Sequence, residues 1–240
     1  MQFDEFRVLT FDCYGTLIDW ETGILGVLRP WATRAKIAAD DSQLLAAFGE
    51  AESAAQRATP GAIYPEILRD THARMSAHFG VKPDAHAAAA FGNSVGDWPA
   101  FPDTPDALRR LQRGHKLMIV SNVDRASFAR TQPKLGVTFD AVVTAEEVGA
   151  YKPDLKMFHR ALEISADWGF SVQQILHVGQ SLFHDHAPAK TMGLKSAWVK
   201  RPSPREELGA TRDPGEEVKP DLEVSSLMEL ADVIDNTGVK

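Results

Sequence analysis

The sequence contains a single cysteine in 240 residues, Cys13, so no disulfide can form within the chain. This cysteine usage suits a reducing compartment and predicts a cytoplasmic protein. No stretch approaches the roughly 18 consecutive apolar residues that span a membrane. The start MQFDEFRV contains acids and lacks the apolar run of a signal peptide. Internal repeats and long low-complexity tracts are missing as well, so we expect a globular chain with no membrane partner.

Positive charge is also scarce. The chain has 26 Lys and Arg against 33 Asp and Glu, which gives a formal net charge of -7 at pH 7. This balance disfavours nucleic acid or an anionic membrane as the main partner and leaves a small-molecule substrate as the expectation. Hydrophobic residues make up 44% of the chain, enough for one large core or two modest ones.

The stretch Val8–Trp20 carries the first candidate for chemistry. Val8–Phe11 is a short β-prone apolar run that ends at an acid, Asp12, and passes into a turn at Gly15. An acid at the carboxyl end of a buried parallel strand lies where open α/β sheets bind their ligands. Asp12 is therefore a candidate nucleophile, and its alternative role is that of a carboxylate capping a turn or helix.

The character of the sequence changes after this stretch. From about residue 21 to 97 it is rich in Ala, Leu, Glu and Arg, which favours helices. Apolar and small residues recur there at three- and four-residue steps, as on one face of a helix: Tyr64, Ile67, Leu68, Thr71, Met75 and Phe79. Residues 59–61 and 80–83 indicate breaks between helices. We expect a helical insertion between the first strand and the rest of a sheet.

From Phe101 onward, short apolar runs alternate with helical patterns. The expected strands are Leu117–Val120, Ala141–Val143, Ile175–Val178, Ala197–Val199 and Leu222–Val224. A long surface loop is expected over Pro202–Pro220, and a final helix over Leu227–Ile234. This alternation predicts an α/β fold, with a parallel sheet covered by helices on both faces.

Polar residues follow several of these strands at the same relative position: Asp12, Ser121, Lys152, Gln180, Ser181 and, a few residues later, Asp185. The carboxyl ends of parallel strands lie on one edge of a sheet, so these side chains can converge in one crevice. Each alone is compatible with a helix cap or a solvated charge. Their joint placement is difficult to explain by packing and favours an active site.

Four motifs in this order resemble those of the haloacid dehalogenase-like hydrolase superfamily. They are FDCYGTLID (residues 11–19), VSN (Val120–Asn122), YKPD (Tyr151–Asp154) and HVGQSLFHD (His177–Asp185). The resemblance implies a Rossmann-like core formed by residues 1–20 and 98–240. Residues 21–97 fall where many members carry a helical cap over the active site.

Two positions depart from the phosphatases of that superfamily. Tyr14 stands where phosphatases have a second Asp, and Gln180 stands where they usually have a magnesium-binding acid. A phosphate ester expels an alkoxide that needs a proton from that acid, whereas a halide leaves without one. Magnesium prefers carboxylate ligands, so we expect no metal site and no cofactor. The DCYGT form is similar to the (S)-2-haloacid dehalogenase branch, which uses no metal.

The resemblance to that branch implies a role for each site residue. Asp12 would attack the halogen-bearing carbon of a small 2-haloalkanoic acid, and water would then hydrolyse the aspartyl ester. Lys152 would orient Asp12 and stabilise its charge. Ser121 and Asp185 are the other expected catalytic residues, and the expected substrate-binding residues are Tyr14, Thr16, Asn122 and Ser181, with Asn122 at the departing halide. Dimers are common in this branch, which leaves a homodimer possible.

Two other functions stay open at this point. One is a phosphatase that tolerates Tyr14 and hydrolyses a small phosphate monoester with Mg²⁺. The other is a catalytically silent binding or regulatory protein on the same scaffold. The dehalogenases also carry a substrate-binding arginine in a cap segment that is missing here. Arg34, Arg57 and Arg69 are candidate substitutes, each with the alternative role of a solvated helix residue.

Overall fold

A computed structural model of the chain describes residues 3–203 and 218–237. Within those residues six parallel strands form one sheet in the order β3-β2-β1-β4-β5-β6. The strands are β1 (Val8–Phe11), β2 (Lys116–Ser121), β3 (Ala141–Thr144), β4 (Ile175–Gly179), β5 (Lys195–Val199) and β6 (Leu222–Val224). The parallel sheet expected from the sequence is confirmed. The expected surface loop Pro202–Pro220 lies mostly outside the described residues, which omit 204–217.

Helices follow or precede each strand in the alternating order that the sequence predicts. Five come between β1 and β2, and the first four of these are α1 (Trp20–Ala35), α2 (Asp41–Ala58), α3 (Tyr64–His78) and α4 (Ala85–Gly92). The others are α5 (Thr104–Leu111), α6 (Arg125–Leu135), α7 (Ala145–Val148), α8 (Lys156–Asp167), α9 (Ala187–Thr191) and α10 (Leu227–Thr237). Short 3₁₀ turns lie at Phe3–Glu5, Val95–Asp97 and Val172–Gln174, and a π-helical turn lies at Leu182–His186. None of the described helices is long and apolar enough to cross a membrane.

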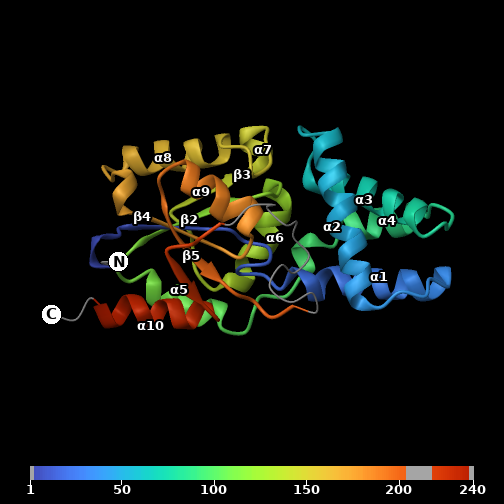
Figure 1. Cartoon of the computed structure of the whole chain (residues 1–240), viewed down its shortest axis with the longest axis horizontal. Coiled ribbons are helices and arrows are strands. Elements are labelled where there is room, and N and C mark those ends of the chain that lie inside the picture. The colour runs from blue at the N-terminus through green and yellow to red at the C-terminus, as the bar shows by residue number, and fades with distance from the viewer. Residues whose placement is uncertain (1–2, 204–217, 238–240) are drawn as a thin grey trace.

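Both faces of the sheet are covered because successive residues of a strand point to opposite sides. In β2, Leu117 and Ile119 pack into one apolar cluster with α5, α6 and α10. Met118 and Val120 pack into a second cluster with α8 and α9 on the other face. Figure 1 shows α5 and α10 below the sheet and α8 above it. The near-continuous apolar runs of the strands therefore reflect burial on both faces.

The helices α1–α4 gather at one end of the molecule, away from most of the sheet (Figure 1). An Asp40 side chain that accepts a hydrogen bond from the Gln43 backbone begins α2, and α2 packs along α3. Of the stripe predicted from Tyr64 to Phe79, the members on α3 are buried, and all of them but Thr71 belong to the main apolar cluster. Phe79 follows the end of α3 and is partly buried against the same cluster. This inserted region matches the cap that the sequence leads us to expect, while its boundaries, residues 21 and 97, stay a prediction.

The topology places one crevice at the carboxyl end of β1. The chain runs outward from β1 through β2 to β3, and then returns to place β4 on the other side of β1. Loops leaving β1 and β4 diverge at this switch point, where open α/β sheets bind their ligands. The residues that follow β1, β2 and β4 therefore meet at the edge of the sheet that faces the inserted helices.

Candidate active site

Asp12 follows β1 directly and is fixed from its backbone outward. Its amide donates to the Val178 carbonyl at 2.9 Å, continuing the ladder between β1 and β4. The chain then turns at Gly15, whose φ of 98° is a conformation that favours glycine. This turn brings the Thr16 hydroxyl to 2.7 Å from Asp12 Oδ2, to which it donates a hydrogen bond. The motif thus orients one oxygen of its own carboxylate.

Lys152 is the centre of the polar network. Its ammonium lies 2.8 Å from Asp12 Oδ1 and 2.6 Å from Asp185 Oδ1, and it also donates to the Val120 carbonyl at 2.8 Å. The side chain is 1% exposed, so this charge has been removed from water and is balanced by the two carboxylates. The Asn122 amide holds the Lys152 backbone, accepting from its N–H at 2.6 Å and donating to its carbonyl at 3.1 Å.

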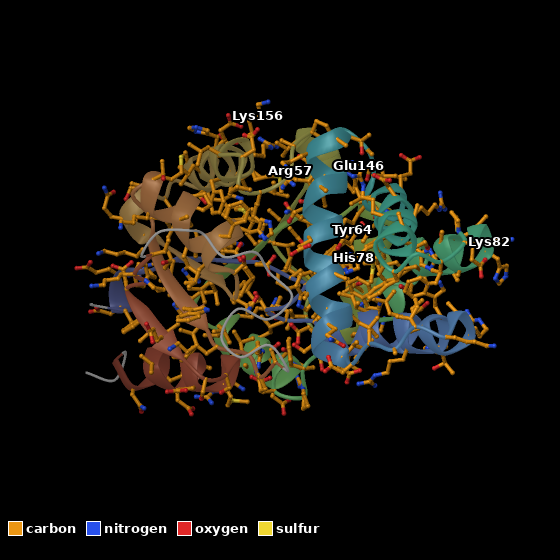
Figure 2. The ribbon with its side chains drawn as sticks, turned by 45° about the vertical axis from the view of Figure 1, so that its right-hand side comes forward. Arg57, Tyr64, His78, Lys82, Glu146 and Lys156 are labelled. Carbon is orange, nitrogen blue, oxygen red and sulfur yellow. The ribbon has the colours of Figure 1, made fainter. Side chains whose placement is uncertain are left out.

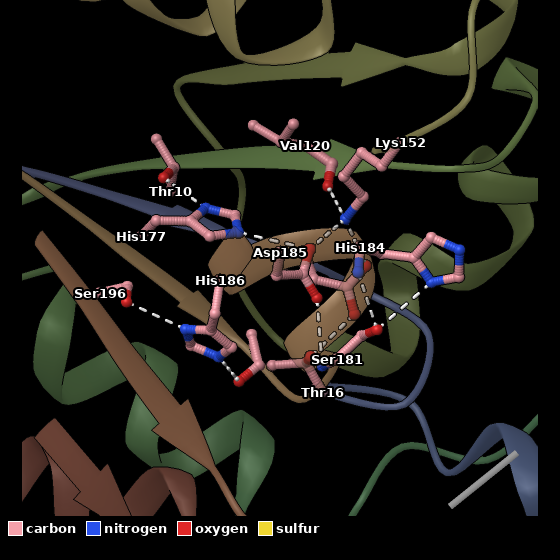
Figure 3. Close-up of polar contacts among 12 residues, drawn as sticks. Thr10, Thr16, Val120, Lys152, His177, Ser181, His184, Asp185, His186 and Ser196 are labelled. Atoms are coloured by element: carbon pink, nitrogen blue, oxygen red, sulfur yellow. Dashed lines mark hydrogen bonds and ion pairs between the residues drawn. The ribbon is translucent and has the colours of Figure 1, made fainter. Parts of the chain in front are cut away.

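Asp185 is held from the other side, as Figure 3 shows. The π-helical turn after β4 brings its Oδ2 to 3.2 Å from the Ser181 backbone N–H. His177 Nε2 lies 3.3 Å from Asp185 Oδ1, and His177 Nδ1 lies 2.9 Å from the Thr10 hydroxyl. Because a carboxylate only accepts, Nε2 carries the donating proton of His177. Asp185 is therefore a fixed partner for Lys152 and for anything that lies beside it.

Burial and charge act differently on the two carboxylates. Burial raises the pKa of Asp12, and the Lys152 ammonium opposes part of that rise. Burial also raises the pKa of Asp185, but the Lys152 ammonium and the hydrogen bond from His177 outweigh this effect and hold that pKa below its ordinary value. The pKa of Lys152 is raised because its two carboxylate partners outweigh its burial. Lys152 therefore stays protonated between the two acids at neutral pH.

His186 supports the strand end that carries the site. Its ring is buried, with Nδ1 2.9 Å from the Ser196 hydroxyl and Nε2 3.0 Å from the Gly179 carbonyl. Burial lowers the pKa of His186 to about 4, so the ring is neutral at pH 7. The carbonyl can only accept, so Nε2 donates and Nδ1 accepts from Ser196. The end of β4 is thereby fixed beside Asp185.

Gly179 is the position where Asp185 approaches the backbone most closely. A Cβ on Gly179 would lie 2.7 Å from the Asp185 side chain, which is closer than atoms pack. We expect Gly179→Ala to displace Asp185 and to lower catalytic turnover about 10- to 100-fold, since misplaced catalytic groups cost rates of this order. The matched control is Gly26→Ala on α1, where a Cβ would meet nothing within 4 Å. Equal activity of the two variants would contradict this placement of Asp185.

A cavity of about 40 Å³ opens where these residues meet. Seven of the eight predicted site residues line it: Asp12, Tyr14, Ser121, Asn122, Lys152, Ser181 and Asp185. The eighth, Thr16, does not line the cavity and contacts it only through its hydrogen bond to Asp12. The Ser121 hydroxyl is buried in this lining and, among the described residues, has no hydrogen-bond partner. It is the kind of group that a bound substrate satisfies.

Tyr14 lines the cavity with its ring and directs its hydroxyl elsewhere. The hydroxyl lies 2.8 Å from the Thr131 hydroxyl on α6, and the ring packs edge-on against Trp98. Burial raises the pKa of the Tyr14 phenol well above its ordinary value. A buried phenol of this kind gives up its proton less readily than a carboxylic acid, so Tyr14 is a poor replacement for a second Asp.

The cap contributes residues that the sequence motifs do not identify. Glu52 on α2 and Tyr64 on α3 line the same cavity as Asp12, together with Trp20 and His184. Glu52 lies on α2 one turn after Phe48 and one turn before Gln56, on the face that packs into the apolar cluster. An acid on the apolar stripe of a helix is the one signal in the sequence that distinguishes Glu52.

None of the three candidate arginines lines this cavity, and all three are exposed. Arg57 lies at the end of α2, on the side of the cap that faces Lys156 (Figure 2). Both line a second cavity of about 490 Å³, which shares Lys152 and His184 with the first. Arg69 lies against Asn93 in the cap. The cap therefore presents an acid, Glu52, and a phenol, Tyr64, to the cavity, and none of the three candidate arginines.

The donors around Asp12 do not fit a magnesium ion. Mg²⁺ requires several hard oxygen ligands in near-octahedral geometry. Lys152 already occupies one oxygen of Asp12 and one of Asp185, and Gln180 replaces a third acid. In the described part of the chain, no group of three or more His, Cys, Asp or Glu side chains is arranged to hold a metal. The other oxygen of each carboxylate already accepts a hydrogen bond, from the Thr16 hydroxyl for Asp12 and from the Ser181 N–H for Asp185.

Comparison with known families agrees with this geometry. The family model of haloacid dehalogenase-like hydrolases matches residues 6–193, which is well over half of the chain. The chain belongs to the haloacid dehalogenase-like hydrolase family. It is thus a hydrolase with a Rossmann-like core and an inserted helical cap.

Its curated relatives are distant and differ in activity. Haloacid dehalogenase-like hydrolase domain-containing protein 3 of Xenopus laevis is 32% identical over 110 residues, 45% of this chain and 44% of the relative. The (S)-2-haloacid dehalogenase of Pseudomonas putida is 28% identical over 127 residues, 52% of this chain and 54% of the relative. A glyceraldehyde 3-phosphate phosphatase of Methanocaldococcus jannaschii is 27% identical over 139 residues, 57% of each. The chain spans about half the length of these relatives.

Among solved structures, the L-2-haloacid dehalogenase from Xanthobacter autotrophicus with chloropropionic acid covalently bound is similar over nearly the whole chain. The TM-score is 0.77, with 98% of this chain and 100% of that chain covered. The sequence identity is 19%, so this likeness shows a shared fold.

Proposed function

We propose that this protein is a metal-independent hydrolase that cleaves the carbon–halogen bond of a small 2-haloalkanoic acid. The observation that carries the proposal is the position of Asp12 and Tyr14 at one cavity. Asp12 has the ion pair and hydrogen bond that orient a nucleophile, and the residue two positions on is a phenol tied to Thr131. Such a site has a nucleophile and lacks the proton donor that a phosphate ester needs.

In the first step, an oxygen of Asp12 attacks the carbon that bears the halogen. A carbon–oxygen bond forms, the carbon–halogen bond breaks, and the halide leaves with the bonding electron pair. The departing halide needs no proton, so this step does not require an acid at the position of Tyr14. Lys152 keeps Asp12 oriented. Once Asp12 is a neutral ester, the Lys152 ammonium is balanced by the carboxylate of Asp185.

In the second step, water adds to the carbonyl carbon of the Asp12 ester. The bond between that carbon and the ester oxygen breaks. One proton of the attacking water passes to the departing alkoxide oxygen and the other is released to solvent, so that a 2-hydroxy acid leaves and the Asp12 carboxylate is regenerated. The Lys152 ammonium stabilises the oxyanion that forms on Asp12, because the two groups are already in contact. Asp185, with its pKa held low, stays ionised and balances Lys152 while Asp12 is esterified.

This function is tested by halide release from 2-chloropropionate and 2-bromopropionate with and without EDTA. We expect release in both conditions and rates that agree within about twofold, because the donors do not fit a metal ion. Complete loss of activity in EDTA, restored by Mg²⁺, would contradict the proposal.

The competing function is that of a phosphatase, because the glyceraldehyde 3-phosphate phosphatase of Methanocaldococcus jannaschii is about as similar in sequence as the haloacid dehalogenases are. That reading requires hydrolysis of p-nitrophenyl phosphate that depends on added Mg²⁺. We expect none above the rate of the Asp12→Asn variant, since Gln180 and Tyr14 remove both a metal ligand and the proton donor.

A further inference from the structure

Glu52 is a buried acid in the cap that faces the catalytic cavity, and the chemistry described above leaves it without a role. It is 5% exposed and lines the same cavity as Asp12 and Ser121. Its Oε1 accepts from Gln56 Nε2 at 2.6 Å and from the Tyr64 hydroxyl at 3.2 Å. Within residues 3–203 and 218–237, no hydrogen bond is recorded to its Oε2. A substrate in the cavity therefore meets a fixed carboxyl group whose second oxygen is available to it.

The charges around this cavity oppose a second anion. Its lining holds three acids, Asp12, Asp185 and Glu52, together with one ammonium, Lys152, and the imidazole of His184. That ammonium already contacts both aspartates. An ionised 2-haloalkanoate would bring a further carboxylate beside Glu52, while the one ammonium of the lining is already shared by two aspartates. Burial of an unpaired like charge is strongly unfavourable.

We propose that Glu52 is the specificity-determining residue of the cap, and that it favours substrates with a neutral, hydrogen-donating head group over carboxylates. A 2-haloalkanamide fits this description, because its N–H groups can donate to Glu52 Oε2 while its carbonyl accepts from the Ser121 hydroxyl. This inference rests on the proposed carbon–halogen hydrolysis and changes its preferred substrate: the same site should favour the amide over the acid as the pH rises above 7. The bonds made and broken are those above, and the product is a 2-hydroxy amide.

The protonation state of Glu52 adds a pH dependence to this selectivity. Burial raises the pKa of Glu52 to about 7, and the hydrogen bond from Tyr64 opposes part of that rise. Other titratable groups that face it are Tyr151, Tyr14, Asp12, Asp185, Lys152 and His184. Below the pKa the neutral acid can donate to a carboxylate, and above it the carboxylate of Glu52 repels one. Discrimination against haloacid anions is therefore expected to increase as the pH rises through 7.

The test compares kcat/KM for 2-chloropropionamide and 2-chloropropionate, measured as chloride release at about pH 6 and about pH 8. For the unmodified enzyme at the higher pH we expect the amide to be preferred at least about tenfold, with the preference falling about tenfold at the lower pH. Glu52→Gln is expected to raise kcat/KM for the acid about tenfold at the higher pH and to remove the pH dependence of the ratio. Glu50→Gln, on the exposed side of the same helix, is the matched control and should leave the ratio unchanged.

Three outcomes would count against the inference. A preference for the acid at the higher pH would overturn it, and so would a ratio that neither pH nor Glu52→Gln alters. In either case chloride is still released, so the proposed carbon–halogen hydrolysis survives. Release of chloride from neither substrate would instead remove the proposed function, and this inference with it. The pH dependence of the unmodified enzyme decides the matter even if Glu52→Gln fails to fold.

Discussion

Replacing Asp12 by Asn is expected to lower halide release by about 10⁴-fold or more, because the amide has no carboxylate oxygen to form the ester. The replacement keeps the volume of the side chain. It leaves Lys152 paired with Asp185 at 2.6 Å, so the fold should persist. Chloride or bromide release at saturating substrate, together with the thermal unfolding midpoint, measures both effects.

The matched control for Asp12 is Asp167→Asn at the exposed end of α8, which removes a carboxylate far from the cavity lining. Its activity should equal that of the unmodified enzyme. If Asp12→Asn retained more than about 1% of the activity, a nucleophilic role for Asp12 would be excluded, since loss of a covalent nucleophile costs far more than this.

Replacing Lys152 by Met is expected to affect activity and stability together. In the described part of the chain, Lys152 pairs with both buried carboxylates, and removing it leaves Asp12 with the Thr16 hydroxyl and Asp185 with His177 and the Ser181 N–H. Breaking a buried ion pair in this way costs about 3–5 kcal/mol in the free energy of unfolding. Turnover should fall about 10³-fold, because the oxyanion formed on Asp12 loses the charge that stabilises it. Urea denaturation and halide release provide the two measurements.

The control is Lys190→Met on α9, an exposed lysine, which should change the free energy of unfolding by less than about 0.5 kcal/mol. A Lys152→Met variant as stable as this control would mean that the two carboxylates do not depend on Lys152. A variant that is destabilised but fully active would separate the structural role from the catalytic one and refute the latter.

The sheet and the insertion could be predicted because their signals are local. Runs such as Leu117–Val120 and Ile175–Val178 are apolar at every position, which burial on both faces of a parallel sheet requires. The helical stripe on α3 is buried where its spacing predicts. The positions of Asp12, Ser121 and Lys152 at one edge follow from parallel topology alone, because each comes after a strand.

Other features depend on contacts that no spacing encodes. The Tyr14 hydroxyl contacts Thr131, more than a hundred residues away, and its direction could not be read from the motif. Asn122 lines the cavity, where its role at the departing halide stays a prediction, and both ends of its amide also hold the Lys152 backbone, a contact that the motif does not indicate. Glu52 reaches the cavity only because α2 lies across the carboxyl edge of the sheet. The family motifs do not include this position, so the sequence alone does not place Glu52 at the cavity.

The covalent intermediate at Asp12 is tested most directly by a single-turnover reaction in H₂¹⁸O. Enzyme in excess over 2-chloropropionamide, or over 2-chloropropionate at the lower pH, is allowed to react once, digested, and analysed by mass spectrometry. Because water attacks the carbonyl carbon of Asp12, the heavy oxygen should enter the carboxylate of Asp12, and the hydroxy product should carry ordinary oxygen. Heavy oxygen in the product, with an unlabelled peptide containing Asp12, would show direct attack of water on the substrate and contradict the account.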